Sequence, residues 1–274
     1  MIRAAIIGIS GRMGHALVRA AGERSDIRIT AAVASRGSSS IGRDAGELAD
    51  AGKTGVTVTD ELAKALVDVD VAIDFSNGSA TAGNLAACRA ARRPLLIGTT
   101  GYPAVELASQ FDAAAREIAL LVASNTSVGI TLLEALVRTA AQALPATFDI
   151  EVFEAHHRMK RDAPSGTALT LGEAAAAGRR DGQGLRPDEL AAARARPPGP
   201  RGEGDIGFAV VRGGDIVGEH SVLFAGPGER ITLSHSATDR AVFARGALAA
   251  ARWLARRPPG RFSMRDFIFA GSKT

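Results

Sequence analysis

Apolar runs of strand length alternate with helix-like segments through the first half of this 274-residue chain, and this alternation constrains its fold most. The first run, residues 2–9, passes through a glycine-rich turn into a helical pattern over residues 15–23. Further strand-length runs lie at residues 28–34, 56–59, 71–76, 95–98 and 118–123. The alternation predicts an α/β domain with a doubly wound, mainly parallel sheet.

The glycine-rich turn after the first strand is a candidate binding site. Its glycines are spaced three apart, at Gly8, Gly11 and Gly14, in place of the commoner G-x-G-x-x-G. The turn joins a strand to a helix N-terminus, which favours a Rossmann-type dinucleotide site with the pyrophosphate at the helix end. A tight turn with glycines for packing only is the alternative. The residues expected to contact the dinucleotide are Gly8, Ile9, Ser10, Gly11, Arg12, Met13 and Gly14.

The end of the second strand bears on the choice of cofactor. A dinucleotide fold commonly places an acidic residue there, about 20 residues after the glycine turn, to bind the adenine ribose. Ala34, Ser35 and Arg36 occupy that place here, with one cation and no carboxylate. We therefore expect these residues to contact the cofactor, and NADPH to serve at least as well as NADH.

Polar residues also follow the fifth and sixth predicted strands. In a parallel sheet, ligands bind beyond the carboxyl ends of the strands. Although each segment alone is more often a plain turn, both are expected at the nicotinamide end of the cofactor. The residues concerned are Gly98, Thr99 and Thr100 after one strand, and Ala123, Ser124, Asn125 and Thr126 after the other.

The pattern changes after these strands. Three strands joined by Gly-Gly and Gly-Pro-Gly turns predict a second, α+β domain built on a mostly antiparallel sheet, and a final amphipathic helix is expected to return to the first domain. We expect a dinucleotide-binding domain of residues 1–126 plus 237–274, and a substrate-binding and oligomerisation domain of residues 127–236. The elements expected in the second of these domains are helix 128–142, strand 148–155, an exposed polar arm or loop at 178–204, and strands 206–212, 215–224 and 230–235. The final helix, 240–256, is expected to belong to the dinucleotide-binding domain.

Residues 154–168 concentrate the groups that can move protons. Two of the five histidines, His156 and His157, are adjacent, and Lys160 follows closely. A histidine can donate a proton near neutral pH, and a neighbouring lysine cation increases its acidity while attracting carboxylates. His156 and Lys160 are therefore the candidate catalytic residues, although either histidine alone is equally well interpreted as structural. His220 and His235 are expected to be structural or to line the same cavity.

An anion site is expected beside these groups. Pro164-Ser165-Gly166-Thr167 precedes a strong helix-forming sequence, so Ser165 is predicted to be an N-cap or close to one. The N–H groups of Gly166 and Thr167 would then point out of the helix N-terminus, where a carboxylate or phosphate binds well. A capped helix that binds nothing is the alternative. Together with His157, Ser165, Gly166 and Thr167 form the candidate substrate-binding set.

Composition narrows the class of protein. A net charge of +4 raises the question of nucleic-acid binding, but aromatic residues make up only 4% and the arginines are dispersed. An anionic substrate and cofactor explain this charge better. Cys88 is the single cysteine and has no partner for a disulfide or metal cluster, so no metal site is expected. A strand begins at residue 2 and no apolar run is long enough to span a bilayer, so we expect a cytoplasmic protein without membrane or nucleic-acid partners.

Five motifs extend over nearly the whole chain. They are Gly8-Ile-Ser-Gly-Arg-Met-Gly, Asp74-Phe-Ser, Gly98-Thr-Thr-Gly, Asn125-Thr-Ser-Val-Gly and Glu154-Ala-His-His-Arg-Met-Lys-Arg-Asp-Ala-Pro-Ser-Gly-Thr-Ala. In this order they resemble the 4-hydroxy-tetrahydrodipicolinate reductase family, also called the dihydrodipicolinate reductases. The resemblance implies reduction by NAD(P)H of the cyclic imine dicarboxylate that 4-hydroxy-tetrahydrodipicolinate forms by losing water. The product would be tetrahydrodipicolinate, for lysine and diaminopimelate biosynthesis.

The resemblance also implies roles for single residues. His156 resembles the family's proton donor and Lys160 its second acid/base residue. His157, Gly166 and Thr167 resemble the site for a substrate carboxylate. Members of the family are typically homotetramers assembled through the sheets of their second domains, which suits the strands expected in the second half of this chain.

The chain departs from the family at two places, and two other functions stay open. Ala34-Ser35 lacks the acidic and basic pair that many members carry, and Thr126 replaces an aromatic residue. One alternative is an aspartate-pathway or amino-acid dehydrogenase of the same architecture, which would need an acid/base set other than His-His-x-x-Lys. The other is a non-catalytic, nucleotide-sensing regulator that retained the fold.

Overall fold

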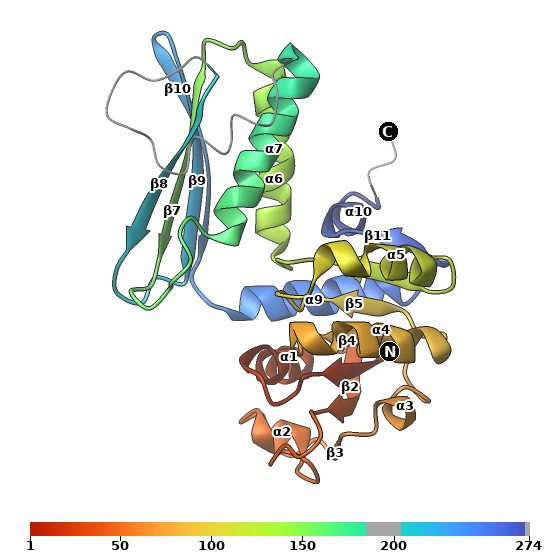
Figure 1. Cartoon of the computed structure of the whole chain (residues 1–274). Coiled ribbons are helices and arrows are strands. Elements are labelled where there is room, and N and C mark those ends of the chain that lie inside the picture. The colour runs from red at the N-terminus through yellow and green to blue at the C-terminus, as the bar shows by residue number, and fades with distance from the viewer. Residues whose placement is uncertain (185–203, 272–274) are drawn as a thin grey trace. The chain divides into compact units, whose positions relative to one another are not determined.

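The computed structural model describes residues 1–184 and 204–271, which form two compact units (Figure 1). Unit 1 comprises Met1–Val128 and Ala241–Thr274, and unit 2 comprises Gly129–Arg240. The chain thus returns to unit 1 with helix α9 (Ala241–Leu254) after it has formed unit 2. Within the described ranges, no helix is both long and apolar enough to cross a bilayer.

Unit 1 is built on a parallel sheet, whose described strands have the order β11-β6-β5-β4-β1-β2-β3. Strands β1 (Ile2–Ile7) and β4 (Val71–Asp74) lie side by side, and the chain continues outward from them in opposite directions. This is the doubly wound arrangement that the sequence predicts. The other strands are β2 (Ile27–Val33), β3 (Val58–Thr59), β5 (Leu95–Ile97), β6 (Ala119–Val122) and β11 (Gly260–Phe262).

Alternate side chains of β1 enter two hydrophobic cores, one on each face of this sheet. Ala4 and Ile6 pack in the core that contains helices α1 (Arg12–Gly22) and α9, whereas Ala5 and Ile7 pack in the other. A strand buried on both faces must be apolar throughout, which explains the continuous run at the start of the chain. The second core contains α3 (Leu62–Ala65), α4 (Thr81–Ala90) and α5 (Ala104–Ala115), and the unit also has α2 (Ala45–Leu48), the 3-10 helix η1 (Gly78–Ala80) and α10 (Met264–Ile268).

Unit 2 contains a mixed sheet, whose described strands have the order β10-β9-β7-β8. Strand β9 pairs antiparallel with both β7 and β10, while β8 pairs parallel with β7. The Gly-Gly turn, at Gly213-Gly214, predicted that β8 and β9 are antiparallel neighbours, and this is wrong, because β8 and β9 lie on opposite sides of β7. Glycine signals show where a chain turns, but not which strand becomes its neighbour. The strands are β7 (Asp149–His156), β8 (Ile206–Arg212), β9 (Gly218–Gly226) and β10 (Glu229–Ala237).

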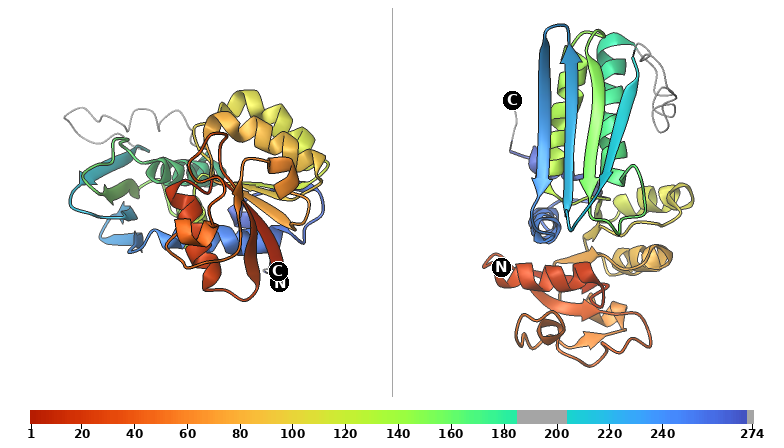
Figure 2. Two further views of the ribbon diagram at one scale, coloured as in Figure 1. Left: turned by 90° about the horizontal axis from the view of Figure 1, so that it is seen from below. Right: turned by 90° about the vertical axis from the view of Figure 1, so that its left-hand side faces the viewer.

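Helices α6 (Val128–Ala143) and α7 (Gly166–Gln183) cover one face of this second sheet (Figure 2). Val137 of α6 and Leu171 of α7 are fully buried in the core beneath them. The two helices approach closely at Gly178, where a Cβ would lie only 2.3 Å from the carbonyl oxygen of Arg138. This packing fixes the direction of α7 and hence the place of its N-terminus.

The polar arm expected at residues 178–204 is wrong at its beginning, because α7 continues to Gln183. Arg179 is 3% exposed and donates to the backbone carbonyls of Phe148 and Gly204. Its charge is therefore used inside unit 2 and not on an exposed arm. Residues 185–203 of the predicted arm lie outside the described residues.

Candidate active site

The three glycines of the turn in unit 1 are needed for two different reasons, close packing and space for a ligand. Gly8 has φ +93°, and a Cβ there would lie 2.7 Å from the carbonyl oxygen of Phe75, which follows β4. A Cβ on Gly14 would lie 2.5 Å from the carbonyl oxygen of Gly8. A Cβ on Gly11 would meet nothing nearer than 3.4 Å. Packing therefore explains Gly8 and Gly14, whereas Gly11 leaves open space at the surface, as a pyrophosphate site needs.

The N-terminus of α1 at this turn is suited to an anion. Gly11 is its N-cap, makes no side-chain cap hydrogen bond, and no acidic residue lies in the first turn. Ser10 and Arg12 are exposed, so both can reach a ligand. Ile9 is fully buried and Met13 packs against the core, so these two can contact a dinucleotide only through the backbone or a small part of the side chain. The positive end of the helix dipole favours phosphate here.

The loop after β2 lies beside the glycine turn. The Ser10 hydroxyl is 3.1 Å from the hydroxyl oxygens of both Ser38 and Ser40. Ala34 is buried, whereas Ser35 and Arg36 are exposed. Residues 34–43 include no carboxylate, and Ser38 and Ser40 place hydroxyl groups beside the glycine turn.

The strand ends expected at the nicotinamide are partly committed to internal contacts. Thr99 is buried, and its hydroxyl donates to the Asp74 carboxylate at 3.1 Å. The Thr126 hydroxyl donates to the Phe243 carbonyl of α9 at 2.7 Å. These two hydroxyl groups are therefore used in hydrogen bonds within unit 1. Thr100 and Ser124 are exposed, Ala123 and Asn125 are partly exposed, and Gly98 lies against the Phe75 ring.

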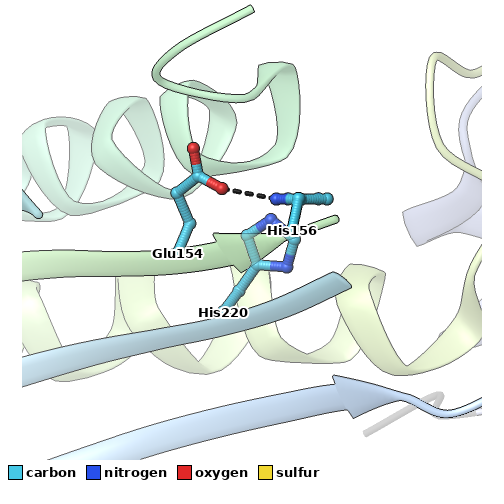
Figure 3. A group of neighbouring side chains, drawn as sticks. All are labelled: Glu154, His156 and His220. Carbon is cyan, nitrogen blue, oxygen red and sulfur yellow. Dashed lines mark hydrogen bonds and ion pairs between the residues drawn. The ribbon is translucent and has the colours of Figure 1, made fainter. Parts of the chain in front are cut away.

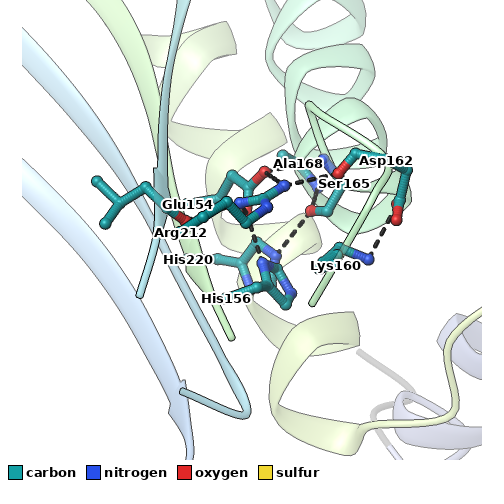
Figure 4. Close-up of polar contacts among 9 residues, drawn as sticks. Glu154, His156, Lys160, Asp162, Ser165, Ala168, Arg212 and His220 are labelled. Atoms are coloured by element: carbon teal, nitrogen blue, oxygen red, sulfur yellow. Dashed lines mark hydrogen bonds and ion pairs between the residues drawn. The ribbon is translucent and has the colours of Figure 1, made fainter. Parts of the chain in front are cut away.

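In unit 2, the end of β7 presents Glu154 and His156 on the same face of the sheet, because residues two apart in a strand point the same way. Their side chains bond to each other through His156 Nδ1 and Glu154 Oε2 (Figure 3). Arg212, at the end of β8, donates to both oxygens of Glu154 at 2.7 and 2.9 Å. The Ser165 N–H donates to Oε1 at 3.0 Å. Glu154, at 0% exposure, is thus the buried centre of a polar cluster (Figure 4).

The protonation states follow from these contacts. Burial alone would raise the pKa of Glu154, but hydrogen bonds from Arg212, His156 and the Ser165 N–H hold it below its ordinary value. Burial lowers the pKa of His156, and the Glu154 carboxylate opposes that shift. The cluster therefore contains an ionised carboxylate, an arginine cation and a histidine that is neutral at neutral pH and can be protonated at the cost of desolvation.

His220 of β9 completes the cluster. Its ring lies edge-on to that of His156, with centroids 5.1 Å apart, and its Nε2 lies 3.2 Å from the Ser165 hydroxyl. Burial lowers the pKa of His220 to about 4, so the ring is neutral at physiological pH. The expectation that His220 is structural or lines the same cavity fits its contacts.

Lys160 lies in the loop between β7 and α7. Its ammonium group binds the Asp162 carboxylate at 2.9 Å (Figure 4). The Asp162 carbonyl accepts from Arg212 at 2.6 Å, and the Lys160 N–H donates to the carbonyl of His157. The loop is thereby tied to the same arginine that holds Glu154, while the His157 side chain lies half-buried beside it.

The predicted N-cap is confirmed at the start of α7. The Ser165 hydroxyl accepts from the Ala168 N–H at 3.2 Å. Gly166 is exposed, and a Cβ added to it would meet nothing within 4 Å. Because the first N–H groups of a helix have no acceptor within the helix, this end of α7 is suited to an anion.

Glu154, His156 and His220 also have the chemistry of metal ligands, since one ligand atom from each lies within 4.8 Å of the others. Arg212 already binds both oxygens of Glu154, however, and would face any metal ion with its positive charge. This donor set therefore fits proton transfer better than metal binding.

Comparison with known proteins identifies the family. A family model for the N-terminus of dihydrodipicolinate reductase matches residues 2–126, and a model for its C-terminus matches residues 129–268. The chain belongs to the dihydrodipicolinate reductase family. The reductase is 51% identical over 266 residues to the 4-hydroxy-tetrahydrodipicolinate reductase of Allorhizobium ampelinum, with 96% of each chain covered. It is 49% identical over 267 residues to that of Alkalilimnicola ehrlichii, with 97% of this chain and 98% of the other covered.

A solved structure shares the fold of the reductase. Dipicolinate-bound dihydrodipicolinate reductase from Paenisporosarcina sp. TG-14 has a TM-score of 0.74 and 25% identity, over 96% of this chain and 97% of that one. The fold class and the family predicted from the motifs are both confirmed. The chain is an NAD(P)H-dependent oxidoreductase.

Sequence reasoning missed Glu154, Arg212 and Asp74. For Glu154 a signal was present, since its spacing of two from His156 in a predicted strand places both side chains on one face. Arg212 had no such signal, because its position depends on β8 pairing with β7 across 58 residues of chain. Asp74 stands in a recognised motif, but its role as acceptor for the Ser76 N–H and for the Thr99 and Asn84 side chains appears only in the fold.

Proposed function

We propose that the reductase converts 4-hydroxy-tetrahydrodipicolinate, through its dehydrated cyclic imine, to tetrahydrodipicolinate in lysine and diaminopimelate biosynthesis. The observation that carries this proposal is the match of both family models, which together span nearly the whole chain. The relatives at about half identity are named for this activity. The buried cluster in unit 2 offers the proton donor that such a reduction needs.

In the proposed reaction the substrate gains a hydride and a proton. A bound nicotinamide cofactor supplies the hydride. His156 delivers the proton from Nε2, because its Nδ1 is bound to Glu154, and Lys160 serves as the second acid/base residue. Positioned groups of this kind contribute roughly 10² to 10⁴ in rate.

We assign the substrate carboxylate to the N-terminus of α7. The backbone of Gly166 and Thr167 supplies N–H donors there, and Ser165 fixes the cap. His157 and Lys160 lie on the loop that precedes it and add polar or positive groups. In this assignment residues 127–236 form the substrate-binding domain.

Residues 1–126 plus 237–274 are proposed to bind the dinucleotide. The pyrophosphate is placed on the turn at residues 8–14, the adenine ribose at residues 34–36, and the nicotinamide at residues 98–100 and 123–126. Two exposed cations, Arg12 and Arg36, and the absence of a carboxylate at residues 34–43 favour a 2′-phosphate. We therefore expect NADPH to be used at least as well as NADH, and a KM for NADH far below that for NADPH would contradict this.

We propose that the reductase is a homotetramer assembled through the second sheet. The face of this sheet opposite to α6 and α7 carries no helix among the described residues (Figure 2). Phe153 is 41% exposed and Val211 40% exposed on strands of this sheet. Burying such side chains against a second copy would be favourable. Light scattering that gives the mass of a monomer would contradict the assembly.

The proposed function is tested by supplying the substrate, generated in situ, and following the loss of NADPH absorbance. We expect turnover by the native protein, and at least about 100-fold lower kcat for His156→Ala and for Lys160→Ala. A folded protein that oxidises no NADPH with this substrate would contradict the proposal. Turnover with another aspartate-pathway or amino-acid substrate, or NADPH binding without turnover of any, would favour the two alternative functions.

A further inference from the structure

We propose that Glu154 and Arg212 are positioning residues, which together fix His156 and the Lys160 loop for proton transfer. The proposal rests on the role of His156 in the proposed function and adds to it two residues from the interior of unit 2. It concerns the ion pair between the buried Glu154 and the partly buried Arg212, which joins the proton donor, the anion site and the lysine loop.

Glu154 determines which nitrogen of His156 carries the working proton. The carboxylate is ionised and accepts hydrogen bonds, so His156 Nδ1 must be the N–H donor between them. Nε2 then holds the lone pair in the neutral ring and the transferable proton in the imidazolium. A neighbouring carboxylate also stabilises the imidazolium, so the same contact orients the ring and supports its acid form.

Glu154 also fixes the anion site, because its Oε1 accepts from the Ser165 N–H at 3.0 Å. Ser165 is the N-cap of α7. The first turn of that helix and the ring of His156 are therefore held by the two oxygens of one carboxylate. A rigid carboxylate between them sets the distance from the proton donor to the bound anion.

Arg212 extends this control to the lysine loop. Its guanidinium binds both oxygens of Glu154 and also donates to the Asp162 carbonyl at 2.6 Å. The Asp162 carboxylate in turn binds Lys160. Because the guanidinium is planar and rigid, these contacts fix the loop relative to the carboxylate.

Gly218 lies beside Nε2 of His156. A Cβ on Gly218 would lie 3.2 Å from Nε2 and 3.5 Å from Cδ2. The first distance is tighter than nine in ten real contacts of a Cβ, so the imidazole ring would have to shift by a few tenths of an ångström. An alanine at position 218 would therefore press on the nitrogen that delivers the proton, and not on the one that binds Glu154.

The charged and titratable groups around His156 come from four elements. Glu154 lies on β7, Arg212 on β8, His220 on β9, and Lys160 on the loop before α7. Glu154 raises the pKa of His156, whereas Arg212 and Lys160 lower it. Removing the carboxylate charge therefore removes the group that favours protonation of the ring and leaves Arg212 and Lys160, which oppose it.

The test is Glu154→Gln, which keeps the shape of the side chain and removes its charge. Histidine-selective ¹⁵N NMR of the native protein is expected to show His156 protonated on Nδ1 when neutral. In the variant the pKa of His156 is expected to fall by about one unit or more. In the kcat/KM profile, the decline on the basic side should then move to lower pH, because less of the proton donor is charged at a given pH.

The matched control is Asp70→Asn in unit 1. Asp70 accepts from the Arg3 guanidinium at 3.0 Å, so this change also removes a carboxylate from an arginine pair. The control is expected to leave the pH profile and the pKa of His156 unchanged. An unshifted pKa of His156 in Glu154→Gln, or an equal shift in the control, overturns the proposal. The NMR readout needs no turnover, so it separates this outcome from failure of the proposed function, which an inactive native protein would show.

Two further variants extend the test, and the second of them, Gly218→Ala, does not depend on the folding of Glu154→Gln. The double variant Glu154→Gln with Arg212→Met removes both charges, and its kcat is expected to fall no further than that of the worse single variant, because the two residues act as one unit. Multiplicative losses would contradict the coupling. Gly218→Ala is expected to lower kcat by about 10-fold to 100-fold with Kd for NADPH unchanged, and an unchanged kcat would contradict the assignment of Nε2.

Discussion

Alanine should have different effects at the second and third glycines of the nucleotide turn. At Gly11 it should weaken the binding of NADPH, and at Gly14 it should lower the stability of the fold. A Cβ on Gly14 would lie 2.5 Å from the Gly8 carbonyl oxygen and 2.6 Å from Ile9 Cα. These are backbone atoms, so no change of rotamer relieves the overlap. A Cβ on Gly11 would approach nothing closer than 3.4 Å, and its backbone at φ −88° and ψ 162° is allowed for alanine.

The expected magnitudes follow from these distances. Gly14→Ala gains about 1 kcal/mol of helix propensity, but α1 must move away from backbone atoms of the turn, which places the overpacking cost at the upper end of its usual range, about 2–3 kcal/mol. We expect the free energy of unfolding to fall by about 1–2 kcal/mol in net terms. Gly11→Ala should cost at most about 1 kcal/mol, as a poorer N-cap. Its methyl group would stand where the pyrophosphate is proposed to bind, so Kd for NADPH should rise at least about 10-fold.

Urea denaturation without nucleotide measures the first effect, and titration of NADPH fluorescence measures the second. Gly11→Ala that binds NADPH as tightly as the native protein would refute the placement of the pyrophosphate. Gly14→Ala with undiminished stability would refute the packing argument. Each variant serves as the control for the other, because both add the same methyl group to the same turn.

Three further outcomes are expected. The pKa of His220 falls from an ordinary 6.5 to about 4 on folding. The neutral ring therefore makes its full contribution to the free energy of unfolding above pH 6.5, and this contribution is lost as the pH falls toward 4. This loss of stability amounts to at most about 3 kcal/mol and should be smaller in His220→Gln. Urea denaturation at several pH values measures it, and the same pH dependence in the native protein and the variant would contradict the prediction. Asp74→Ala leaves the buried Thr99 and Asn84 donors without their acceptor, and should lower stability by about 2–4 kcal/mol in the same assay, so an unchanged midpoint would count against the network. Burial raises the pKa of the Cys88 thiol, so a thiol reagent should label it only after unfolding; rapid labelling of the native protein would contradict its burial.

Local features of the fold could be predicted from the sequence. The apolar run of β1, the glycine turn and the Ser165 cap each depend on residues close together in the chain, and the structure has all three. The short strand β11 (Gly260–Phe262) was not predicted, because its three residues, of which Arg261 is exposed, form no apolar run. It exists because it pairs with the buried strand β6.

Long-range pairing could not be predicted in the same way. The turn at Gly213-Gly214 gave the reversal of the chain, but the pairing of β8 with β7 is decided by the packing of the whole sheet on α6 and α7. Arg212 reaches Glu154 only through that pairing. Arg179 similarly looked like a surface charge, although close packing of α7 on α6 buries it against backbone carbonyls. Charged residues that satisfy buried acceptors have no local signature in a sequence.

The central claim, hydride transfer from NADPH to the cyclic imine dicarboxylate, is tested most directly by isotope transfer. NADPH that carries deuterium on both C4 positions is incubated with the reductase and with substrate generated in situ, and the product is analysed by mass spectrometry. We predict tetrahydrodipicolinate that contains a single deuterium, formed in step with the loss of NADPH absorbance. Product without deuterium, or no product from a folded protein that binds NADPH, would contradict the claim.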